Sequence, residues 1–240
     1  MKNLLLLLIF ALQLSAIQAP KEILITTESW EDLTNKDGSG LYFDIVRAIY
    51  EPVAIEVKFK IVPYNRSSNM VKQKKADLWL GSYIDEEDYA LYPKYYFDQD
   101  IVTAMFKTSK FPNFKGIKSL KDKNVGWVRG YGYQEYIDVK MKIHERNDRK
   151  TILLSLEKDR FDIFLDDADD MQESIKQIKF DTSKYKFIKL MTFKLYPAFR
   201  NDTKGVELKK IWDARFKKLL DDGSMKNIFI KNNYEEYFLY

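Results

Sequence analysis

The order of strand-like and helix-like patterns near the start of the chain most constrains its fold. Apolar runs or alternation typical of strands occupy residues 21–27, 53–62 and 76–81, and helical spacing of apolar residues occupies 41–50 and 65–75. This is a β-α-β-α-β order. Such an order predicts a parallel sheet covered by helices, because parallel strands need a crossover connection.

A second set of alternating patterns follows. An apolar strand within residues 95–107 leaves the first unit, and residues 109–113 connect it to the next. Further strands are predicted at 124–129, 161–165, 186–191 and 193–199, and helices at 151–159, 168–177, 204–221 and 225–230. A turn at residues 130–133 is predicted to enter a helix that runs to about Glu145, with His144 on its solvated face.

These patterns predict an α/β protein of two lobes, each with a mostly parallel sheet flanked by helices. Lobe 1 is expected to comprise residues 20–107 plus 190–240, and lobe 2 to be inserted as residues 110–187. Two segments would then cross between the lobes and form a hinge. A cleft between lobes is a common place for a small ligand, and hinge closure is a common motion.

The composition excludes several chemistries. The chain has no cysteine, which rules out disulfides, thiolate metal sites and cysteine nucleophiles. It has one histidine, His144, and no Gly-x-Ser-x-Gly sequence for a hydrolase triad. The 40 basic and 36 acidic residues are scattered along the chain, which argues against nucleic acid as a partner. We predict neither a cofactor nor a metal ion.

The N-terminus has the pattern of a secretory signal peptide over residues 1–19. A basic start at Lys2 precedes the apolar run of residues 4–12, and small residues including Ala19 follow. The run is shorter than the roughly 20 apolar residues of a membrane span. We therefore predict export to the periplasm without a lipid-bearing cysteine; an uncleaved anchor is the alternative.

Six short motifs occur in an order that is similar to one known family. They are residues 40–45 (GLYFDI), 62–66 (VPYNR), 75–77 (KAD), 117–126 (IKSLKDKNVG) with the following turn 129–133 (RGYGY), 162–167 (DIFLDD) and 219–224 (LLDDGS). With them, almost the whole mature chain resembles the family 3 periplasmic solute-binding proteins that serve ABC transporters for polar amino acids. The resemblance implies the type II periplasmic binding fold, a monomer and a small polar or zwitterionic, amino-acid-like solute held between lobes. It also implies an inner-membrane ABC permease as a partner, and no enzymatic activity.

One departure from the family concerns the ligand. Amino-acid binders of the family have a T-x-E-R segment whose Arg pairs with the ligand carboxylate. Arginine suits this role because its guanidinium group can form two parallel hydrogen bonds with a carboxylate. Here residues 84–88 read IDEED, so Asp88 stands where the Arg is expected. Either Arg66 takes over that role from the preceding loop, or the ligand is a cation.

The candidate ligand-binding residues lie at predicted strand ends and helix starts. Trp30 is expected to stack on the ligand or to close the edge of the core, and Arg66 to bind an anion or to form a surface ion pair. The backbone N–H groups of the turn at residues 130–133 are candidates for an anion site. Of Asp166 and Asp167, one is expected to bind an ammonium group and the other to cap a helix. The full set is Trp30, Tyr64, Arg66, Gly81, Ser82, Tyr83, Gly130, Tyr131, Gly132, Tyr133, Asp166 and Asp167.

Two other functions fit the same fold. A sensor or interaction domain would explain the missing carboxylate-binding Arg. A small dehydratase-like enzyme would use the acid-rich segments, since such an enzyme needs a general acid with a raised pKa.

Overall fold

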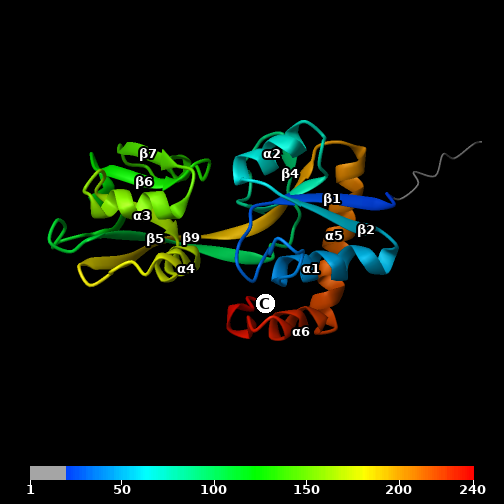
Figure 1. Ribbon diagram of the computed structural model, residues 1–240. Helices are drawn as coiled ribbons and strands as arrows, with labels where there is room; N and C mark the ends of the chain where they lie inside the picture. Colours follow the sequence, from blue (N-terminus) through cyan, green and yellow to red (C-terminus); the bar gives the residue numbers. More distant parts are fainter. Residues whose placement is uncertain (1–19) are drawn as a thin grey trace, which may run out of the picture.

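The computed structural model describes residues 20–240; the predicted signal peptide, residues 1–19, lies outside this range. Its helices and strands form two groups that are joined by two long strands (Figure 1). We call these groups the first half and the second half. No helix within residues 20–240 has the length and apolar character that crossing a membrane requires.

The first half is built on a parallel three-stranded core. β1 pairs in parallel with both β2 and β3, as the β-α-β-α-β order predicts. The elements of this half are β1 (Glu22–Thr27), α1 (Leu41–Tyr50), β2 (Glu56–Ile61), α2 (Tyr64–Lys72), β3 (Leu78–Ser82), β4 (Ala90–Leu91), α5 (Thr203–Asp221), α6 (Ser224–Lys231) and the 3-10 turns η1 (Glu51–Val53) and η4 (Glu235–Tyr237).

The second half also has a parallel three-stranded core. β6 lies between β7 and β8 and is parallel to both. Its elements are the 3-10 turns η2 (Gly116–Leu120) and η3 (Tyr133–Glu135), the strands β6 (Asn124–Val128), β7 (Lys142–Arg146) and β8 (Ile163–Asp167), and the helices α3 (Arg149–Glu157) and α4 (Ala168–Ile178).

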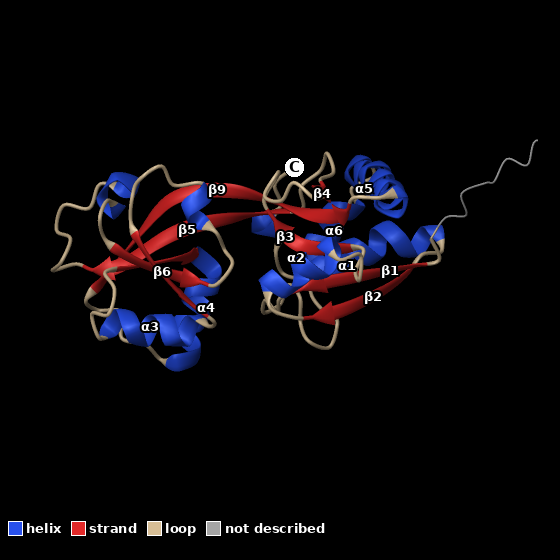
Figure 2. Cartoon of the chain, turned by 90° about the horizontal axis from the view of Figure 1, so that it is seen from above, coloured by secondary structure: helices blue, strands red, loops and turns tan. Residues whose placement is uncertain are grey.

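Two antiparallel strands cross from one half to the other. β5 (Asp98–Lys107) pairs with β9 (Tyr185–Arg200) from its first residue to its last. At about 3.3 Å per residue, the 16 residues of β9 extend roughly 50 Å, which is long enough to enter both sheets. Figure 2 shows both strands bridging the halves. The sheet order is β2-β1-β3-β9-β5-β8-β6-β7, so the chain is a mixed α/β protein of the two-lobed type.

Each half has its own buried aromatic side chains. Trp79 and Trp212 are fully buried in the first half, and Trp127 is fully buried in the second. The indole N–H of Trp212 donates to the carbonyl of Tyr95 (3.1 Å), which satisfies its polar group inside the core. An aromatic side chain buries about 150–250 Å², so each of these residues is a large part of the core of its half.

The structure overturns two local predictions. The predicted helix from the turn to about Glu145 is wrong: η3 covers three residues, and β7 follows as an edge strand paired with β6. The side chains of β7 are mostly polar, so the strand is specified by backbone pairing and not by an apolar pattern. His144 therefore lies on a strand, where its Nε2 is 3.0 Å from Oδ1 of Asn124 and its ring stacks on Phe161. The two strands predicted within residues 186–199 are one continuous strand, β9.

Candidate functional site

A cavity of about 850 Å³ opens between the two halves. The first half contributes the loop after β1, the start of α1 and the end of β3. The second half contributes the loop after β6 and one side of α4. The start of β5 lines the hinge side, and residues 231–237 at the C-terminal end line another part. A volume of this size falls within the roughly 300–1,000 Å³ of small-molecule sites.

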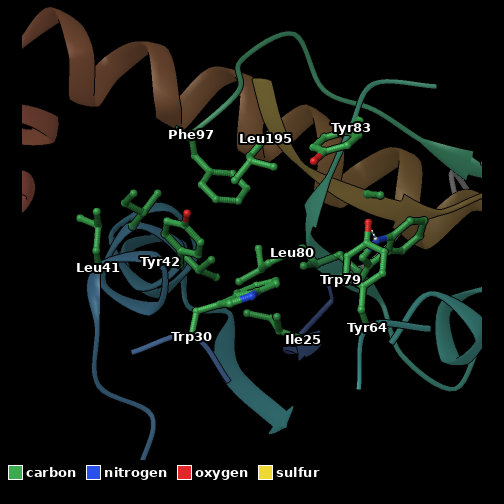
Figure 3. Close-up of a cluster of buried hydrophobic side chains, with 14 of the residues drawn as sticks. Ile25, Trp30, Leu41, Tyr42, Tyr64, Trp79, Leu80, Tyr83, Phe97 and Leu195 are labelled. Carbon is green, nitrogen blue, oxygen red and sulfur yellow. Dashed lines mark hydrogen bonds between the residues drawn. The ribbon is translucent and has the colours of Figure 1, made fainter. Parts of the chain in front are cut away.

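Seven aromatic side chains line the cavity, two of them Tyr234 and Tyr237 near the C-terminal end. We call the other five the aromatic wall: Trp30, Tyr42, Tyr64, Tyr83 and Tyr131. The rings of Trp30 and Tyr42 meet edge to face, with centroids 6.2 Å apart. The rings of Tyr64 and Tyr131 also meet edge to face across the two halves, with centroids 5.9 Å apart. Figure 3 shows the four members from the first half around one end of β3. Such a wall offers ring faces and edges to a flat or cationic ligand.

Gly81 determines where Trp30 lies. A Cβ at position 81 would be 2.7 Å from Cη2 of Trp30, and the φ of +84° at Gly81 belongs to the region that glycine adopts readily. The loop that carries Trp30 is held by Thr34, whose hydroxyl accepts from the N–H of Trp30 and donates to the carbonyl of Glu28. Trp30 thus belongs to the core and to the cavity wall at once, with 9% of its surface exposed.

Three aspartates converge on the hinge side of the cavity, and we call Asp98, Asp100 and Asp167 the hinge carboxylates. The hydroxyl of Tyr42 donates to Oδ2 of Asp98 at 2.7 Å, and the hydroxyl of Tyr83 donates to Oδ2 of Asp100 at 2.7 Å. Each of these two tyrosines of the aromatic wall therefore orients one aspartate at the start of β5.

Asp167 has a structural role as well as a place in the cavity wall. Its Oδ1 accepts from the N–H groups of Asp169 and Asp170 and so caps the N-terminus of α4. Its Oδ2 accepts from the N–H of Ile101 at 2.7 Å, which ties the start of α4 to β5. The neighbouring Asp166 is fully buried and is not part of the lining.

The hinge carboxylates have no cationic partner in the described part of the chain. Among residues 20–240, no lysine or arginine nitrogen lies within 4.0 Å of any of the three. Burial, reinforced by the charge of Asp167, raises the pKa of Asp98 to about 6. Burial and then the charge of Asp167 also raise the pKa of Asp100 well above its usual range. Several negative charges gathered in one buried region repel one another, so a cation among them would be favourable.

Glu86 adds a fourth carboxylate on the side of the first half. Its Oε2 accepts from the hydroxyl of Tyr64 (2.6 Å), the hydroxyl of Ser82 (2.8 Å) and the N–H of Tyr83 (3.0 Å). Burial raises its pKa in spite of these bonds. The segment in which an arginine was expected therefore supplies an acid to the cavity, whereas Asp88 is exposed and outside the lining.

Arg149, which sequence reasoning missed, forms the main ion-pair network near the cavity. It lies at the start of α3 with 14% of its side chain exposed. Its Nε donates to Oδ2 of Asp166 (2.7 Å), and its Nη2 donates to the hydroxyl of Tyr131 (2.6 Å) and to Asp170. Its Nη1 lies 3.9 Å from Oε1 of Glu28 in the first half. Arg149 thus neutralises acids of both halves and is not itself part of the lining.

The structure brings six of the predicted residues into the cavity wall and leaves six outside it. Those inside are Trp30, Tyr64, Gly81, Tyr83, Tyr131 and Asp167; those outside are Arg66, Ser82, Gly130, Gly132, Tyr133 and Asp166. Arg66 is exposed on α2. The N–H of Gly130 donates to Oε1 of Glu145 at 3.0 Å, which occupies the group expected to hold an anion. Tyr133 is fully buried against Trp127.

Sequence reasoning also missed Tyr42, Asp98, Asp100 and the C-terminal residues of the lining. A usable signal was present at residues 97–101 (FDQDI), where two acids precede the apolar run of β5. Charged residues at the start of a buried strand often belong to a ligand-binding site, because burying an isolated charge costs free energy.

The pKa of Asp98 gives a testable effect on stability. The unfolded group has its ordinary pKa near 3.8 and the folded group a pKa of about 6, so folding takes up a proton between these values. This contribution makes the protein more stable as the pH falls from 7 towards 4. At pH 7.5 the charged group costs roughly 3 kcal/mol, which Asp98→Asn should largely remove.

We expect urea unfolding at pH 7.5 to show that Asp98→Asn is more stable than the parent, and at pH 4.5 to show little difference. Tyr42, Asp167 and Asp169 face the same group and remain unchanged in the variant. Asp138→Asn, at an exposed position outside the cavity, is the control. An equal loss of stability at both pH values would contradict the assignment.

Sequence comparisons identify no relative. No protein-family model matches the chain, and no curated protein matches it.

Solved structures match it over nearly their whole length. An ancestral arginine-binding protein bound to arginine is 17% identical, with a TM-score of 0.71 over 91% of this chain and 99% of the other. The GluR0 ligand-binding core from Nostoc punctiforme in complex with L-glutamate is 15% identical, with a TM-score of 0.70 over 88% and 99%. An ABC uptake transporter substrate-binding protein from Streptococcus pneumoniae with bound histidine is 18% identical, with a TM-score of 0.67 over 88% and 92%. The chain therefore has the two-lobed fold of amino-acid ABC transporter substrate-binding proteins.

Proposed function

We propose that this chain is an extracytoplasmic solute-binding protein that captures a small polar solute of amino-acid size between its halves. The observation that carries the proposal is the cavity of about 850 Å³, which is lined from both halves and from a strand that crosses between them. The structural neighbours with bound histidine, L-glutamate or arginine support a binding role. We further propose that the solute is passed to an ABC permease and that residues 1–19 direct export to the periplasm.

The proposed lobes are residues 20–107 plus 190–240 and residues 110–187, with β5 and β9 as the hinge. Side chains of the two halves already meet beside the cavity, and we propose that this is the closed arrangement. The amide of Gln177 donates to Oε2 of Glu31 at 3.2 Å, and the rings of Tyr83 and Tyr136 have centroids 5.4 Å apart. A solute that bridges both sides would favour this closed arrangement by its differential affinity for it. We propose a binding role without catalysis. We also propose that the protein acts as a monomer.

A thermal-shift screen of the purified protein against a panel of polar metabolites tests the proposal. A solute present at 100 times its Kd should stabilise the fold by about 2.7 kcal/mol. For a chain of this size that corresponds to a rise in Tm of roughly 5–10 °C. Small-angle scattering of the same sample should show a smaller radius of gyration with the solute than without it. If no solute of the panel raises the Tm or reduces the radius of gyration, the proposal is wrong.

The contact between Gly130 and Asn65 gives a test of closure itself. A Cβ at position 130 would lie 2.3 Å from Oδ1 of Asn65, a residue of α2 in the opposite half. We expect Gly130→Ala to weaken solute binding about tenfold, since 1.4 kcal/mol of strain in the closed arrangement has that effect. Removing the opposing side chain with Asn65→Ala in the same protein should restore most of the affinity.

Gly116→Ala is the matched control for backbone strain. Gly116 also has a positive φ (+67°), but a Cβ there would meet nothing within 4 Å. It should leave the affinity close to that of the parent. If Gly130→Ala binds as tightly as the parent, the halves do not close through this contact.

A further inference from the structure

The charges of the cavity lining are strongly unbalanced. Ten of the lining side chains are acidic and two are lysines. The acids are Glu31, Asp32, Glu86, Asp98, Asp100, Asp167, Asp169, Asp170, Glu173 and Glu236. Both lysines are exposed and already paired: Lys231 lies 2.9 Å from Asp44, and Lys176 lies 3.7 Å from Glu173. A solute with a net positive charge would relieve this imbalance.

The donors beside the hinge carboxylates and Glu86 are already used by these acids. The hydroxyls of Tyr42, Tyr64 and Tyr83 each donate to a cavity carboxylate. The N–H groups at the start of α4 donate to Asp167, so the helix terminus is capped from within. Arg149 is outside the lining and is paired with acids of its own. A ligand carboxylate placed beside these acids would therefore meet acceptors and negative charge.

Two cavity carboxylates, Glu86 and Asp100, lie at opposite ends of one tyrosine. The N–H of Tyr83 donates to Glu86, while the hydroxyl of the same tyrosine donates to Asp100. The two acids are therefore separated by the length of a tyrosine, and both line the cavity. Asp98 is more than nine-tenths buried beside Asp100 and has no cation within 4.0 Å in the described chain. Two separate cationic groups would satisfy both ends.

Tyr83 of the aromatic wall lies between these two acids, and the other members of the wall line the same cavity. Ring faces attract ammonium and guanidinium groups and also pack against the methylene groups that connect them. From the charge, the donors already in use and the spacing of the acids, we propose that the solute is a di- or polyamine: an organic cation with at least two amino or guanidino groups and no carboxylate. This inference rests on the proposed function, because it names the solute of the same cavity.

Calorimetric titration with matched pairs of compounds tests the inference. Cadaverine and lysine, putrescine and ornithine, and agmatine and arginine each differ only by the carboxylate. We expect each amine to bind at least ten times more tightly than its amino acid at pH 7.5. Amino acids that bind as tightly as the amines, or more tightly, would overturn the inference. So would binding of Ca²⁺ or Mg²⁺ alone that excludes the amines.

The same titration separates this inference from the proposed function. If a neutral or anionic solute of the metabolite panel binds and no amine does, the choice of amines is wrong and the binding role stands. If nothing binds, the proposed function fails and this inference fails with it.

Variants test which carboxylates recognise which end of the solute. Asp100→Asn should weaken cadaverine binding at least tenfold. Glu86→Gln should weaken cadaverine at least fivefold but leave pentylamine, which has one amino group, within twofold. Asp138→Asn, on the exposed surface outside the cavity, should change neither. Equal losses for cadaverine and pentylamine in Glu86→Gln would refute two-point recognition, and circular dichroism of each variant checks that it is folded.

Discussion

The antiparallel pairing of β5 with β9 is the constraint on which the rest of the structure depends. The pairing extends from Asp98 opposite Leu195 to Lys107 opposite Tyr185, and β9 continues into the first sheet beside β3. Both halves are therefore attached to one continuous ladder. Because the ladder passes between the halves, the first residues of β5 face the space between them. The fold thus places two aspartates at a hinge, where they meet little solvent.

Burying acidic side chains between the halves costs free energy of folding, and this cost points to a functional role for them. A carboxylate that loses water without gaining a cation shifts its pKa upwards, and Asp98, Asp100 and Glu86 all do so. Elsewhere the chain pairs its buried acids, as Arg149 does with Asp166. Asp166 is paired outside the cavity, whereas the hinge carboxylates and Glu86, which line it, have no cation within 4.0 Å in the described part of the chain. This contrast indicates a place where negative charge is left for a partner. Functional sites commonly retain such destabilising groups.

Much of the fold could be predicted from the sequence, and half of the predicted site residues line the cavity. Apolar periodicity located β1, α1, β3 and β8 because each buries an apolar face. Trp30, Tyr83 and Asp167 could be proposed because they follow such strands. β7 could not be recognised, since a polar edge strand is specified by its neighbour.

The remaining site residues depend on contacts between distant parts of the chain. Arg149 meets Asp166 and Glu28 only in the folded protein, so no local pattern distinguishes it from a surface arginine such as Arg66. We propose that a small cation occupies the cavity between the halves. Native mass spectrometry of the protein purified without denaturation can detect it. We expect a retained basic solute in the parent that is absent from Asp100→Asn; a retained acidic solute, or the same solute in both proteins, would rule the cation out.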